Sequence, residues 1–190
     1  MKMQDIATES YATAQEKGWW DDSVPRDEEM LHFLMISELS EALEDFRAHK
    51  GVTESWLENG SKPCGIPSEA ADLIIRIGDL SGKKGIDFSL YPDLGADLNA
   101  AIAIAPVPVM VPIWRTQPKE FGGAMMRATS RVCFVNDTFL HADEVAYAYW
   151  RICNDIVWFF DQQGYDLRVM IQQKMDFNKT RPIRHGNKKV

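Results

Sequence analysis

One stretch of the chain, residues 66–80, limits what the whole can fold into, because it is apolar except for a single line of charge. Its charged side chains follow one another at steps of three, four and three residues: Glu69, Asp72, Arg76 and Asp79. On a helix of about 3.6 residues per turn these steps place all of them on one face. The stretch therefore predicts a helix that is packed on most sides and carries one polar stripe.

A second acidic pair, Glu38 and Glu41, lies upstream on another segment with helical periodicity. On a helical wheel the apolar face of this segment is formed by Leu31, Met35, Leu39, Ala42 and Phe46. Glu38 falls inside this apolar arc, and Glu41 lies towards its edge. A lone buried carboxylate costs several kcal/mol, so Glu38 requires a partner.

The two segments together supply two pairs of carboxylates, each pair spaced by three residues along a helix: Glu38 with Glu41, and Glu69 with Asp72. Carboxylate oxygens from neighbouring helices are the ligands that Mg²⁺ prefers. The spacing therefore predicts a metal site on a helical frame.

Hydrophobic periodicity predicts an all-α fold with a single domain over residues 1–190. Core helices are expected at about residues 3–17, 25–49, 67–81 and 143–178, the last range being divided at Gly164. We expect Ser23 near the cap of the second helix, with Pro25 in its first turn. Residues 50–65 are interpreted as a polar connector.

A long irregular insertion is expected at about residues 88–142, with a short helix over residues 124–135 inside it. Its prolines forbid a regular helix through the middle of the segment: Pro106, Pro108 and Pro112. The insertion precedes the last helices of the expected helical bundle.

A short pattern after the third predicted helix returns later in the chain. Gly85-Ile86-Asp87-Phe88 is echoed by Gly164-Tyr165-Asp166-Leu167, each following an apolar helix. The same offset puts Ala148 and Arg151 where Glu69 and Asp72 stand. The echo indicates either a duplicated two-helix unit whose second copy has lost its acids, or two similar helix ends.

Composition excludes several classes of protein. The net charge of -7 argues against broad binding to nucleic acid or to an anionic membrane. The sequence shows no apolar run of membrane-spanning length and no signal peptide. Cys64, Cys133 and Cys153 lack zinc-ligand spacing and are expected to be buried thiols in a reducing compartment, so we expect a cytoplasmic protein.

The C-terminal segment is basic although the chain is acidic. Lys174, Asn178 and Arg181 follow helical spacing, and their donors suit phosphate oxygens. Near the other terminus, Trp19 and Trp20 can either stack on a flat ligand or fill the core.

Taken together, these segments resemble the MazG-like nucleoside triphosphate pyrophosphohydrolases of the all-α NTP pyrophosphatase group. The matching segments are GWWD at 18–21, SELSEALE at 37–44, GIPSEAADLIIRI at 65–77 and KMDFNKTRPIRHG at 174–186. They cover the first ninety residues and the C-terminus.

The resemblance implies a reaction and a set of roles. Water and a (d)NTP would give (d)NMP and pyrophosphate, with Mg²⁺, or alternatively Mn²⁺, held by Glu38, Glu41, Glu69 and Asp72. Glu41 would also act as the catalytic base, and the substrate would be bound by Lys174, Asn178, Arg181 and Trp19. A homodimer or homotetramer is implied as well. Ser37 stands where the family usually has its first acid, which weakens one metal position.

Alternative functions remain at this stage. One is a dUTPase-like enzyme of the same fold, which differs only in base preference. Another is a non-catalytic helical binding or assembly module, in which the acids only pair with Arg76 or Lys174. A di-iron carboxylate bundle is disfavoured, because it needs two E-x-x-H motifs and only Glu29 and His32 form one.

Overall fold

The computed structural model describes residues 1–21, 26–97, 117–137 and 140–187 of the chain. Its helices are α1 (Met3–Glu16), α2 (Glu28–Arg47), α3 (Ile66–Lys84), α5 (Phe121–Asp137), α6 (Ala142–Gln162), α7 (Leu167–Thr180) and the short α8 (Arg184–Asn187). The strands β1 (Trp56–Glu58) and β2 (Lys62–Cys64) form an antiparallel hairpin. The described chain is mostly helical, which confirms the expected all-α class.

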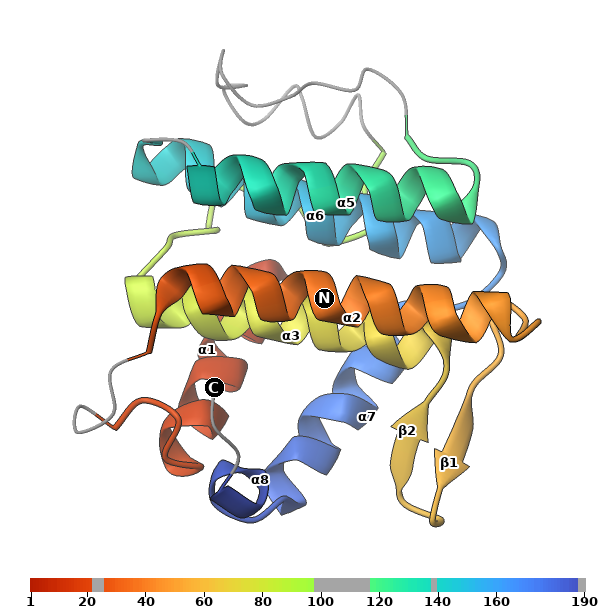
Figure 1. Ribbon diagram of the computed structural model, residues 1–190. Coiled ribbons are helices and arrows are strands. Elements are labelled where there is room, and N and C mark those ends of the chain that lie inside the picture. The colour runs from red at the N-terminus through yellow and green to blue at the C-terminus, as the bar shows by residue number, and fades with distance from the viewer. Residues whose placement is uncertain (22–25, 98–116, 138–139, 188–190) are drawn as a thin grey trace.

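The helices are arranged in layers around α3. In Figure 1, α2 and α3 lie side by side, α5 and α6 form a pair above them, and α1 and α7 lie below. Helix α3 contacts α1, α2, α6 and α7. Glu28 at the start of α2 pairs with Lys84 at the end of α3, so these two helices are antiparallel.

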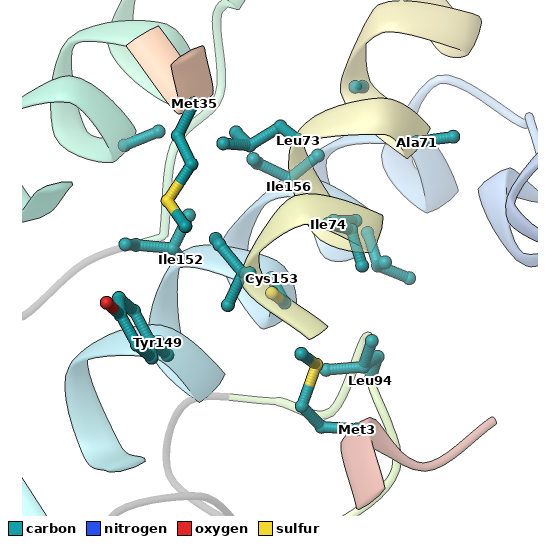
Figure 2. Close-up of a cluster of buried hydrophobic side chains, with 14 of the residues drawn as sticks. Met3, Met35, Ala71, Leu73, Ile74, Leu94, Tyr149, Ile152, Cys153 and Ile156 are labelled. Carbon is teal, nitrogen blue, oxygen red and sulfur yellow. The ribbon is translucent and has the colours of Figure 1, made fainter. Parts of the chain in front are cut away.

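The core lies where α3 meets α2 and α6. Figure 2 shows Met35 of α2, Leu73 of α3, and Ile152 and Ile156 of α6 converging on one cluster. Leu73 is completely buried. Each Å² of apolar surface that these side chains remove from water contributes about 25 cal/mol, and this burial stabilises the packing of the layers against one another.

Two glycines let α1 approach α3 closely. A Cβ atom on Gly78 would lie 2.9 Å from the Ile6 side chain, and one on Gly82 would lie 2.6 Å from the Ala7 carbonyl oxygen. Only glycine fits such a backbone approach without displacing α1. The close contact fixes the position of α1 against α3.

The structure confirms four helices close to their predicted bounds, namely α1, α3, α6 and α7. Helix α2 begins later than predicted, because the Asp27 side chain accepts a hydrogen bond from the Glu29 backbone N–H at 3.0 Å and so caps the helix. The expected cap residue Ser23 and the proline Pro25 lie outside the described residues.

The helix predicted over residues 124–135 is confirmed but longer, as α5, which packs on α6 and α2. The three prolines expected to interrupt the insertion lie outside the described part of the chain. Other expectations from the sequence were wrong. The supposed connector at 50–65 holds the hairpin. Phe46 is 45% exposed and stacks on Phe121, and Cys133 is exposed, so neither is buried as expected.

The repeated sequence pattern corresponds to two helix ends of the same geometry. Gly85 and Gly164 both have left-handed backbones, with φ of 64° and 73°. Ile86 N–H donates to the Ser81 carbonyl, and Tyr165 N–H donates to the Phe160 carbonyl, each at 3.0 Å. These bonds close α3 and α6 in the same way.

A buried ion cluster joins α5 to α6. Arg131 donates to Asp155 Oδ2 at 2.9 Å, and Arg151 Nε lies 2.9 Å from Asp155 Oδ1. All three side chains are at most 3% exposed. Burial lowers the pKa of Arg131, and the neighbouring Asp155 carboxylate opposes this effect.

We expect Asp155→Asn to lower the free energy of unfolding by about 3–5 kcal/mol, because two buried guanidinium groups lose their carboxylate. Urea denaturation measures the loss. Glu44→Gln is the matched control, since Glu44 pairs with Arg47 at 2.8 Å on the surface, and it should leave the midpoint near that of the wild type. Similar small losses in both variants would contradict the prediction.

A buried hydrogen bond joins α2 to α6. His32 Nδ1 lies 3.0 Å from the Glu28 carbonyl oxygen, which can only accept, so Nδ1 carries the proton. Nε2 then accepts from the Tyr149 hydroxyl at 2.6 Å. Burial lowers the pKa of His32 below its ordinary value of 6.5, and the Glu28 carbonyl partly opposes this effect.

His32 should make the fold less stable as the pH falls below about 6.5, because the unfolded chain then takes up a proton that the folded chain resists. The effect of one proton is at most about 1.4 kcal/mol per pH unit. In His32→Gln the stability between pH 7 and pH 5 should fall less steeply than in the wild type. Parallel curves from thermal denaturation would contradict this assignment.

No helix in the described ranges is both long and apolar enough to cross a membrane.

Candidate metal centre and adjoining cavity

Three carboxylates gather between α2 and α3. Glu38, Glu41 and Glu69 each offer an oxygen, and these oxygens all lie within 4.8 Å of one another. Glu38 and Glu41 are three residues apart on α2 and therefore share a face, while Glu69 comes from the first turn of α3. Antiparallel packing brings the second half of α2 beside the start of α3.

Glu38 is buried as the wheel predicted, with 4% of its surface exposed. Its expected partner is Arg76, whose Nε donates to Oε1 at 2.6 Å. Burial raises the pKa of Glu38, and the charge of Arg76 opposes that rise. Because the Glu38 carboxylate is buried, its ionised form requires a positive charge beside it.

Glu69 is half-buried, and burial raises its pKa to about 8. The negative charge of Asp72 adds to the rise, and the ammonium of Lys174 opposes it. The ionised form of Glu69 is therefore disfavoured mainly by burial and further by the neighbouring Asp72.

Asp72, the fourth predicted ligand, is not among the three carboxylates whose oxygens lie within 4.8 Å of one another. Its Oδ2 lies 2.5 Å from Lys174 Nζ, and the same ammonium donates to the Pro63 carbonyl at 3.4 Å. Lys174 comes from α7 and is 3% exposed. In this structure Lys174 is a counterion of Asp72.

A cavity of about 320 Å³ adjoins the carboxylates, between α1, α2, α3 and α7. The predicted site residues that line it are Trp19, Glu41, Asp72, Asn178 and Arg181. Arg76 and Asp79, the remaining members of the polar stripe, line it too. Lys174, the other predicted substrate contact, is not among the lining residues, because it is buried behind Asp72.

Comparison of the chain with family models, curated proteins and solved structures gives no match. The resemblance to the MazG-like enzymes therefore stays a prediction from the motifs.

The end of the cavity away from the carboxylates holds a group that the sequence did not suggest. Trp20 Nε1 donates to Asp79 Oδ1 at 2.6 Å, and Arg26 Nη1 donates to Oδ2 at 3.4 Å. Burial raises the pKa of Asp79 to about 6, although both donors oppose the rise. The position of Asp79 in the polar stripe was a signal for this group, but no pattern indicated Arg26.

The later segment that carries the echoed pattern has no comparable cluster within the described residues. Ala148 and Arg151 stand at the positions that match Glu69 and Asp72, and both are buried. At the position that matches Arg76 the chain has Asp155, which pairs with Arg131 of α5 as Arg76 pairs with Glu38 of α2. The acid and the base of this pair thus stand in the reverse order to those of the pair between α2 and α3.

The residues of the three-carboxylate cluster fit a hard divalent cation. Their donors are all carboxylate oxygens, which suit Mg²⁺ or Mn²⁺ better than softer metals. Glu41 is exposed and lines the cavity, so the cluster is open to solvent and to a ligand on that side. The arrangement can bind a cation and present it to a molecule in the cavity.

We expect Arg76→Met to lower the free energy of unfolding at pH 7 by about 1–3 kcal/mol, because it leaves a buried carboxylate without its partner. The loss should shrink at low pH, where Glu38 takes up a proton. Circular dichroism during urea denaturation measures both effects. The double variant with Glu38→Gln should recover most of the loss, and its failure to do so would mean that Arg76 acts through packing alone.

Proposed function

We propose that this protein is a magnesium-dependent nucleoside triphosphate pyrophosphohydrolase, which converts a (d)NTP to (d)NMP and pyrophosphate. The observation that carries the proposal is the cluster of Glu38, Glu41 and Glu69, which opens through Glu41 onto a cavity of about 320 Å³. That volume lies in the range of small-molecule sites. Arg76 and Arg181 line the same cavity and supply donors for phosphate oxygens.

In this proposal the three clustered carboxylates hold the cation, and Asp72 lies next to them. Bound there, Mg²⁺, or alternatively Mn²⁺, would neutralise triphosphate charge and lower the pKa of the attacking water. Glu41 is exposed at the cavity, where it is placed to take the proton of that water.

The basic residues of the site have two sets of partners in this proposal. In the structure described here, Arg76 pairs with Glu38 at 2.6 Å and Lys174 pairs with Asp72 at 2.5 Å. A triphosphate in the cavity would compete with Glu38 for the Arg76 guanidinium, whereas the buried Lys174 does not line the cavity and would act through Asp72. Arg181 and Asn178, which come from the C-terminal part of the chain, complete the phosphate contacts.

The proposal includes assembly as a homodimer or homotetramer. Helix α2 exposes large apolar side chains that an oligomer would cover: Met30, Phe33 and Leu43, with 41%, 64% and 47% exposure. Exposed apolar groups of this kind are found at subunit contacts.

A second candidate function is a non-catalytic helical binding or assembly module. It is favoured by one observation, the ion pairs of Glu38 with Arg76 and of Asp72 with Lys174, which satisfy two acids within the chain. On this view Mg²⁺ and nucleotides leave the melting temperature unchanged.

The test is to incubate the purified protein with a panel of ribo- and deoxyribonucleoside triphosphates, with and without Mg²⁺, and to separate the products by anion-exchange chromatography. We expect monophosphate and pyrophosphate in the presence of Mg²⁺ only. Glu38→Gln and Glu69→Gln should each reduce the rate by about 100-fold or more, because a group that stabilises charge in the transition state is lost.

Glu44→Gln on the solvent side of α2 is the matched control and should keep the wild-type rate. A preference for dUTP over all others would identify the dUTPase-like alternative. Diphosphate with orthophosphate would show that a different bond is cleaved. Absence of turnover, with a melting temperature that neither Mg²⁺ nor nucleotides change, would favour the binding module.

A further inference from the structure

One end of the cavity is lined by Arg26, Asp79 and Trp19, with Trp20 beside Arg26 and Asp79, and we call it the arginine end. Asp72 and Asp79 are seven residues apart on α3, which is about 10 Å along a helix axis. The arginine end therefore lies two helical turns away from the carboxylates. A nucleotide with its phosphates at the carboxylates extends its base in this direction.

Arg26 keeps donors that the protein does not use. Its side chain is 8% exposed, and its bond to Asp79 Oδ2 is long, at 3.4 Å. Among the residues that the structure describes, none accepts a hydrogen bond from the buried Nε. A buried donor without an acceptor costs free energy, so such a group in a cavity wall points to a ligand.

The surroundings of Arg26 suit a flat ring. Its guanidinium carbon lies 4.4 Å from the centroid of the Trp20 ring and 5.5 Å from that of Trp19. Trp19 and Arg26 both line the cavity. Indole faces offer apolar stacking surface, which a base matches and a phosphate group does not.

Both oxygens of the Asp79 carboxylate at this end face donors of the chain. Asp79 Oδ1 accepts from Trp20 Nε1 at 2.6 Å, and Oδ2 faces Arg26. The arginine end therefore presents N–H donors to a ligand. A carbonyl group is the complementary partner, whereas an amino group would set one donor against another.

We propose that the arginine end recognises the keto group of a nucleobase, so that the cavity prefers 6-keto purines and 4-keto pyrimidines to the corresponding amino bases. The inference rests on the proposed function, because it requires that the cavity takes a nucleotide. An arginine paired with a base carbonyl is a common specific contact. An amino base would leave the buried guanidinium unpaired. A site that is built to form a hydrogen bond with one group strongly rejects an analogue that lacks this group.

The experiment compares ligands that differ at this one group. Inosine and adenosine monophosphates form one pair, and uridine and cytidine monophosphates form the other, so that sugar and phosphate contacts cancel within each pair. Binding is measured with a chelator present, by tryptophan fluorescence and by titration calorimetry. We expect the keto member of each pair to bind about 10-fold more tightly.

Arg26→Lys keeps the charge but loses the planar guanidinium, and it should bring the two members of each pair to similar affinity. Arg47→Lys, on the exposed end of α2, is the control and should keep the preference. Equal affinities in the wild type, or tighter binding of the amino bases, would overturn the proposal. So would an equal loss for all ligands in Arg26→Lys, since it would place a phosphate beside Arg26.

The result is independent of turnover. A keto preference in a protein that hydrolyses no triphosphate would support recognition by Arg26 and overturn the pyrophosphohydrolase proposal. Hydrolysis without any keto preference in binding would support the pyrophosphohydrolase proposal and overturn the recognition of a keto group by Arg26.

Discussion

The ion pair between Glu38 and Arg76 is the contact on which the arrangement of the site depends. It places a carboxylate in the apolar face of α2, where burial alone would be costly, and satisfies it from the polar stripe of α3. The register of the two helices is fixed by this contact near their middle and by Glu28 with Lys84 at one end. Glu41 and Glu69 meet beside Glu38 as a consequence of that register.

Ion pairing also explains how acidic side chains of α2 and α3 can lie close to one another in this part of the fold. Arg76 pairs with Glu38 and Lys174 pairs with Asp72. Burial raises the pKa of Glu69 to about 8, the negative charge of Asp72 adds to the rise, and the charge of Lys174 opposes it. A positive charge beside Glu69 would therefore favour its ionised form.

Periodicity predicted the features that depend on one helix alone. The polar stripe of α3 and the burial of Glu38 both follow from placing residues on a wheel, and the structure confirms them. The pairing of Lys174 with an acid was expected only for the alternative of a binding module, and Asp72 could not be named as its partner because that depends on how α7 crosses α3. Arg26 was missed for the same reason, since its burial comes from tertiary contacts with Trp20 and Asp79.

Sequence patterns failed most clearly between the helices. Helix α5 was expected only as a short piece of an irregular segment, because Gly122 and Gly123 weaken its first turn and prolines precede it. Its stability comes from packing on α6 and α2, including the stack of Phe121 on Phe46. The hairpin was hidden in a polar stretch whose strands have only three residues each.

Helices α5 and α6 pack over α2 and α3, and this arrangement has a consequence for assembly. These four helices belong to one chain, so the contact between the two pairs is intramolecular and does not depend on protein concentration. Dilution cannot open the core in the way that it separates subunits. In the proposed oligomer, a second copy at the exposed side of α2 could bind or dissociate while the carboxylates keep their positions on α2 and α3.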